Sequence, residues 1–251
     1  MPTVAELTAL YENFMLGPQP GPDVCGTCFN FTRGYERCYA CAHVEQWLRA
    51  VAPISYSVGR EQLHHALARY KRLSGEVARQ LAVQLAAVLW RYLAEHERCA
   101  AAAVAADAFE LVTTVPSSDR GRDELHPLRW IVGEVVVPTR GRHERLLRRS
   151  SAALGAHEFS REKYEPVREL RGEPVLLIDD TWTTGANAQS AAAALSAAGA
   201  GPVAAVVIGR HLNREWHEND RRLRGLTRPF DWTRCPLCCP RPPRSNELAP
   251  A

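Results

Sequence analysis

The chain has 251 residues, of which 46% are hydrophobic and 24% charged, as expected for a globular protein with one sizeable core. Its formal net charge of +3 is too small to indicate a nucleic-acid partner by itself. No run reaches the roughly 18 apolar residues of a membrane span, and Glu6 and Glu12 fall where a signal peptide would be apolar. We therefore expect a cytoplasmic protein with no membrane span.

Apolar periodicity predicts a helix over residues 2–16, which a glycine- and proline-rich stretch ends. Further helices are expected over residues 43–51, 60–73, 76–104, 127–135, 143–154 and 186–198. Buried strands are expected over residues 109–115, 174–178 and 202–208, and a polar loop over 119–126. Strands that alternate with helices predict an α/β fold with a parallel sheet flanked by helices.

The chain is expected to divide into three parts. Residues 1–52 hold a helix and a cysteine knuckle, and Ala52-Pro53 marks the boundary to a main domain over 53–212. Residues 213–251 form an arginine- and proline-rich extension. The aromatic side chains of Trp216, Phe230 and Trp232 indicate that this extension lies against the main domain.

Two C-x-x-C pairs near the N-terminus predict a metal site. Four thiolates around one zinc ion make a closed, structural site, and cytoplasmic cysteine pairs usually hold metal or perform redox chemistry. Two disulfides or a redox pair are the alternatives. The expected ligands are Cys25, Cys28, Cys38 and Cys41.

A third cysteine cluster, Cys235, Cys238 and Cys239, supplies half a zinc site without an evident second half in the sequence. It could fold back onto the first site, hold a metal between subunits, or form a reactive tail. Cys99, in a helical stretch, is interpreted as a small core residue.

The most informative stretch is an apolar strand, 175–178, that ends on Asp179 and Asp180. A loop of small hydroxylated residues follows and opens directly into a helix, whose first amides are unpaired and suit an anion. The two carboxylates suit vicinal sugar hydroxyls, so a ribose 5-phosphate satisfies both demands; simple helix capping is the alternative. The expected ligand-binding residues of the loop are Thr181, Thr183, Thr184, Gly185, Ala186 and Asn187.

This stretch resembles the phosphoribosyl-pyrophosphate motif of type I phosphoribosyltransferases: four apolar residues, two acids and a loop that closes on Thr-Thr-Gly. The wider arrangement, over about residues 23–210, is similar to the ComF family of competence-associated proteins. The other matching features are the four-cysteine knuckle, Tyr56 and Gly59 before a helix with Lys71, and a strand that ends in Val115-Pro116. The resemblance implies a type I phosphoribosyltransferase-like fold.

The resemblance also implies that Asp179 and Asp180 hold the ribose hydroxyls, directly or through Mg²⁺, as catalytic residues. The family's pyrophosphate loop follows its Val-Pro strand, which assigns that role here to Pro116, Ser117, Ser118 and Arg120. The chain departs from the family where Arg122-Asp123-Glu124 replaces the usual Phe-Asn-Gln. Contacts that the family makes with an acceptor or partner there do not carry over.

The implied activity is transfer of phosphoribosyl from phosphoribosyl pyrophosphate to a nitrogen acceptor such as a nucleobase. His126 and His211 are candidates for a general base by position alone. The alternative is a non-catalytic accessory or regulatory protein of DNA uptake that binds phosphoribosyl pyrophosphate. In that case single-stranded DNA is a partner, since arginines accumulate between residues 120 and 149. A homo-oligomer is left open.

Overall fold

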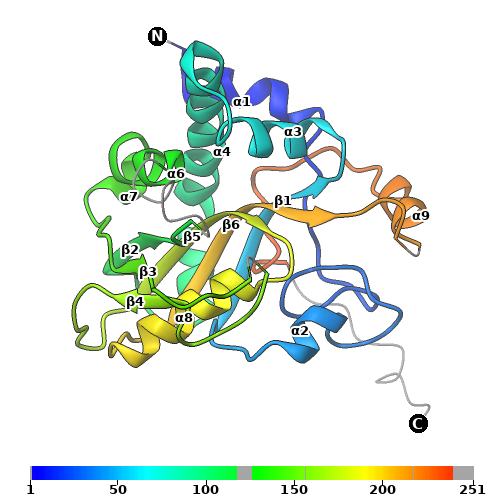
Figure 1. Cartoon of the computed structure of the whole chain (residues 1–251). Coiled ribbons are helices and arrows are strands. Elements are labelled where there is room, and N and C mark those ends of the chain that lie inside the picture. The colour runs from blue at the N-terminus through cyan, green and yellow to red at the C-terminus, as the bar shows by residue number, and fades with distance from the viewer. Residues whose placement is uncertain (1, 118–125, 156, 217, 240–251) are drawn as a thin grey trace.

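The computed structural model describes residues 2–117, 126–155, 157–216 and 218–239. Its centre is a four-stranded parallel sheet with the strand order β1-β6-β5-β2 (Figure 1). A short antiparallel pair, β3 and β4, lies beside it. The strands are β1 (Ala50–Val58), β2 (Leu111–Thr114), β3 (Leu147–Arg149), β4 (Tyr164–Pro166), β5 (Val175–Trp182) and β6 (Val203–Leu212).

Helices cover both faces of the sheet (Figure 1). One face packs against α4, the longest helix, together with α1, α3, α6 and η1, and the other packs against α8. The helices are α1 (Val4–Glu12), α2 (Tyr39–His43), α3 (Gln62–Arg69), α4 (Gly75–Ala102), α6 (Pro127–Trp130), η1 (Ile131–Val135), α7 (Val137–Arg140), α8 (Ala186–Ala197) and α9 (Asn219–Arg224). None of the helices described is long and apolar enough to cross a bilayer.

Strand alternation explains why the sheet has a core on each of its two faces. Along β5, Leu176 and Ile178 enter the core under α4, whereas Val175 and Leu177 enter the core under α8. Successive side chains of a strand point to opposite faces, so a strand covered on both sides is apolar throughout. The prediction of a parallel α/β sheet flanked by helices is confirmed.

The helix predicted over residues 43–51 is wrong. Helix α2 ends at His43, and β1 begins at Ala50 and runs through the domain boundary expected at residues 52/53. β1 was missed because its alanines, serines and Pro53 have weak β propensity. Pro53 is tolerated because β1 lies at the edge of the sheet, where a missing amide donor costs little.

Two other predictions need correction. Residues 143–154 form no helix: Leu146 and Leu147 are buried as expected, but Leu147 is the first residue of β3, which pairs with β4. The aromatic residues of the C-terminal segment also divide. Trp232 is buried and Phe230 packs against the core, as expected, whereas about half of the Trp216 side chain is exposed.

Candidate functional site

The site lies at the carboxyl ends of β2 and β5, where ligands bind in parallel sheets. The strand is longer than expected: β5 stays paired with β6 through both acids to Trp182, so the loop predicted to begin at Thr181 begins at Thr183. A cavity of about 760 Å³ opens at this edge. It brings together these predicted residues: Pro116, Ser117, Asp179, Asp180, Thr181, Thr183, Thr184, Gly185, Ala186 and Asn187. The predicted residues Ser118 and Arg120 lie outside the described residues.

Asp180 is the buried acid of the pair. Its carboxylate accepts hydrogen bonds from the Tyr70 hydroxyl and, at 2.5 Å, from the Lys71 ammonium. The His126 Nε2 atom lies 3.9 Å from the same carboxylate. Burial by itself raises the pKa of Asp180, but the charge of Lys71, followed by His126 and the two hydrogen bonds, outweighs it and lowers that pKa. Asp180 is therefore a fixed anion, held by the segment that follows α3.

Asp179 has a different environment, although it is the next residue along the strand. It is partly buried, and its Oδ1 accepts a hydrogen bond of 2.8 Å from the Asp180 amide. Burial, and then the negative charge of Asp180, raise the pKa of Asp179 to about 7. No described cation neutralises Asp179 by direct contact. It is thus the acid whose charge a bound cation or sugar hydroxyl would stabilise most.

The turn between β5 and α8 depends on Gly185. Its φ of 86° is left-handed, and a Cβ added there would lie 2.2 Å from the Trp182 ring. Trp182 is fully buried, and its ring lies against Gly185 in the wall of the cavity. Only glycine, which has no Cβ, allows the backbone to come this close to the indole ring.

Helix α8 presents its N-terminus to the cavity. The Ala186 amide is hydrogen-bonded to Thr184 Oγ1 at 3.3 Å, and the intrahelical ladder begins with Gln189 donating to the Gly185 carbonyl. The Asn187 side-chain oxygen is buried and has no hydrogen-bond partner among the described residues. Oxygen and nitrogen of an amide are interchangeable by rotation, so Asn187 can offer either a donor or an acceptor to a ligand. The arrangement suits an anion.

Arg210, in β6, connects this turn to the cysteine knuckle. The buried guanidinium donates to the Trp182 carbonyl at 3.2 Å and the Thr183 carbonyl at 3.1 Å, and its Nε donates to the Cys28 carbonyl at 3.1 Å. It therefore holds the turn before α8 on one side and the cysteine knuckle on the other.

The N-terminal cysteines form one buried cluster. The ligand atoms of all four lie within 4.8 Å of one another, and the Cys28 and Cys38 sulfurs are 3.6 Å apart. That distance is too long for a disulfide of about 2 Å but matches two thiolates on one tetrahedral zinc ion. All four cysteines are buried, which leaves no open position for a substrate. Cys25, Cys28, Cys38 and Cys41 could therefore hold a structural metal such as zinc.

Sequence reasoning missed three contributions to the site. Lys71 was noted only as part of a resemblance, and the roles of Tyr70 and Arg210 were not foreseen. Arg210 does leave a signal, since a charged residue inside an otherwise apolar strand needs a buried partner. Of the two histidines considered as bases, His126 caps α6 and faces Asp180, while His211 lines the cavity with its pKa lowered by burial.

Comparison with known proteins adds no assignment: no family model matches the sequence, and neither a curated protein nor a solved structure matches the chain.

Proposed function

We propose that the chain has a type I phosphoribosyltransferase-like fold, binds phosphoribosyl pyrophosphate with Mg²⁺ in this cavity, and transfers the phosphoribosyl group to a nitrogen nucleophile. One observation carries the proposal. An acid pair and the N-terminus of α8 lie on the same cavity and are separated by only five residues of the chain, 181–185. A sugar with a phosphate on its 5-carbon needs these two kinds of group side by side.

The phosphate end of the ligand would meet donors only. The amides at the start of α8 and the hydroxyls of Thr181, Thr183 and Thr184 line the cavity, and the helix dipole adds partial positive charge. Gly185 has no side chain to block the approach of a phosphate. An apolar ligand would leave these donors unsatisfied.

The ribose end would meet Asp179. Its carboxylate is raised in energy by burial and by Asp180, so hydrogen bonds from vicinal hydroxyls or contact with a cation would stabilise it. Asp180 keeps its charge through Lys71 and Tyr70 and adds negative potential without moving. Mg²⁺, when bound, would neutralise the pyrophosphate and help it leave.

In the transfer, the bond between C1 of the ribose and the pyrophosphate oxygen breaks, and pyrophosphate departs with the electron pair. The acceptor nitrogen donates its lone pair to C1, and its proton passes to solvent. Positive charge develops on the sugar between these events, and the carboxylates of Asp179 and Asp180, which line the cavity, would stabilise it. Pro116 and Ser117, which follow the neighbouring strand β2, also line the cavity, and the pyrophosphate would lie against them.

The test is pyrophosphate release from phosphoribosyl pyrophosphate and Mg²⁺ in the presence of a panel of nucleobases. We expect release with at least one base, and its loss in Asp179→Asn but not in Asp107→Asn, a change at an exposed residue before β2, at the other end of the sheet. If phosphoribosyl pyrophosphate binds but none of the bases causes pyrophosphate release, the accessory role is supported instead. If the folded protein does not bind phosphoribosyl pyrophosphate, both the transferase and the accessory role are contradicted.

A further inference from the structure

A second group of metal-binding side chains lies far from the first cysteine cluster in the sequence. His96 and Cys99 come from α4, and Cys235 and Cys238 come from the C-terminal segment. The ligand atoms of these four residues all lie within 4.8 Å of one another. Helix α4 therefore supplies the second half that the C-terminal C-x-x-C pair lacks in the sequence.

The helical half is suited to bind a metal because His96 and Cys99 are three residues apart and share one face of α4. The His96 Nε2 atom lies 2.7 Å from the Trp232 carbonyl, so it carries the proton and donates. The other ring nitrogen, Nδ1, lies 3.8 Å from the Cys99 sulfur and is left as the metal ligand. A carbonyl that accepts from the second nitrogen is the usual support of a metal-bound histidine.

The C-terminal half forms a turn around its own sulfurs. The Cys238 amide donates to the Cys235 sulfur at 3.3 Å, and the Cys235 amide donates to the Cys238 sulfur at 3.2 Å. Amide donation stabilises sulfur as thiolate, the form that binds metal. The Cys239 amide donates to the Cys235 carbonyl at 3.2 Å and closes the turn, while the Cys239 side chain is not among the four ligands.

We propose that His96, Cys99, Cys235 and Cys238 hold a second structural zinc ion, bound by three thiolates and one imidazole. Four protein ligands complete a tetrahedron, so the site has no position for a substrate. Cys99 is then a ligand and not only a small core residue.

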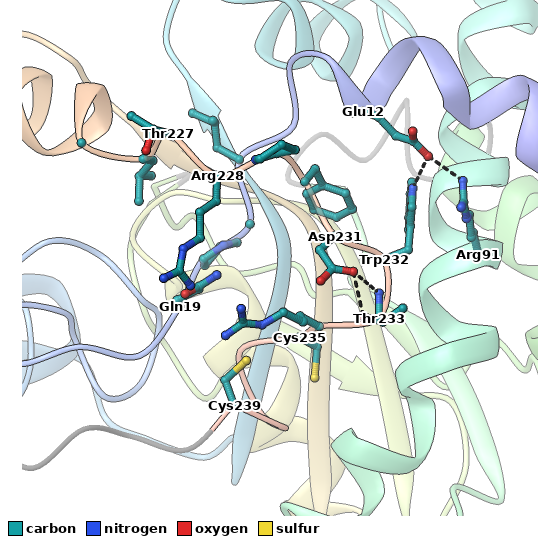
Figure 2. Close-up of a pocket in the computed structure, with 18 residues that line it drawn as sticks. Glu12, Gln19, Arg91, Thr227, Arg228, Asp231, Trp232, Thr233, Cys235 and Cys239 are labelled. Carbon is teal, nitrogen blue, oxygen red and sulfur yellow. Dashed lines mark hydrogen bonds and ion pairs between the residues drawn. The ribbon is translucent and has the colours of Figure 1, made fainter.

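The neighbouring contacts indicate what this zinc would do. Figure 2 shows Glu12 between Trp232 and Arg91, and its Oε1 accepts from the Trp232 indole at 2.6 Å and from Arg91 at 2.8 Å. The Arg91 guanidinium also lies 4.4 Å from the centre of the Trp232 ring. The segment around Trp232 and Cys235 is thus already placed between α1 and α4. A zinc ion would fasten it to α4 across more than a hundred residues of chain.

The experiment is zinc content per chain by mass spectrometry, after purification under reducing conditions. The wild type should carry about two zinc ions, and Cys99→Ser and Cys238→Ser should each carry about one. Cys239→Ser is the matched control, since it lies next to a ligand without being one, and should keep about two. Far-UV circular dichroism and retention of the first zinc show that each variant is folded.

The ligand set is tested independently by replacing zinc with Co²⁺, because thiolate and imidazole ligands give different absorption bands. The difference between the wild-type and Cys99→Ser spectra should show a cobalt ion with three sulfurs and one nitrogen, and His96→Ala should lose that spectrum. A wild type with about one zinc ion, unchanged in Cys238→Ser, would overturn the proposal. So would a Cys235–Cys238 disulfide in folded protein that was purified under reducing conditions.

Discussion

The difference between the two adjacent acids leads to a prediction about stability. Asp179→Asn removes a carboxylate whose ionisation is unfavourable in the folded chain, because burial and then Asp180 raise its pKa to about 7. An amide of the same shape keeps the hydrogen bond from the Asp180 amide. The variant should therefore be more stable than the wild type near neutral pH, although it is expected to lose the ligand.

The sign follows from proton binding. The folded wild type holds the Asp179 proton more tightly than the unfolded chain, so this group stabilises the fold below pH 3.8, and the contribution is lost as the pH rises to about 7. A pKa raised from 3.8 to about 7 corresponds to about 4 kcal/mol at most. Asp179 is only partly buried, so solvent screening reduces this to ~2 kcal/mol.

The assay is urea unfolding of both proteins between pH 5 and pH 8.5. The stability advantage of Asp179→Asn should grow by about 1–2 kcal/mol over that range. Asp107→Asn, at an exposed position, should show no such growth. A constant difference between Asp179→Asn and wild type from pH 5 to pH 8.5 would refute the reasoning about Asp179.

Three further changes test how the site is held. Lys71→Met leaves the Asp180 carboxylate buried without its cation and should cost about 3 kcal/mol in urea unfolding at pH 7. Gly185→Ala forces a Cβ into the Trp182 ring at positive φ, and calorimetry should show about 3 kcal/mol of destabilisation or a complete loss of ligand binding. Arg210→Met removes the guanidinium that holds both the turn before α8 and the cysteine knuckle. Release of zinc from the N-terminal cysteines to a chelator should therefore become at least about tenfold faster. An unchanged release rate would show that Arg210 does not couple the two.

Local pattern explains which parts of the fold were predictable. The apolar run of β5, the acid pair and the glycine turn into α8 are consecutive in the sequence, and a buried strand followed by a helix start has few other structures available. Strand β1 is the opposite case. Its alanines and serines carry little strand signal, and only its pairing with β6 makes it a strand.

The partners that complete each site come from distant segments, which no local pattern reveals. Lys71 and Tyr70 reach Asp180 across about 110 residues, and His96 meets the C-terminal segment across 136. These contacts exist only because α3 packs on the sheet, which brings the segment after it to Asp180, and because α4 runs beside the C-terminal segment. The carboxylate pair could therefore be found from the sequence, whereas the unequal pKa values of its two members could not.

The most direct test of the central claim is calorimetric titration of phosphoribosyl pyrophosphate with Mg²⁺ into zinc-loaded wild type and into Asp179→Asn. We predict binding by the wild type that strengthens up to about tenfold per pH unit as the pH rises toward 7, because the ligand requires the ionised Asp179 carboxylate. The variant should bind at least about a hundredfold more weakly at pH 8. Equal binding by both proteins, or none by folded wild type, would contradict the assignment of this cavity.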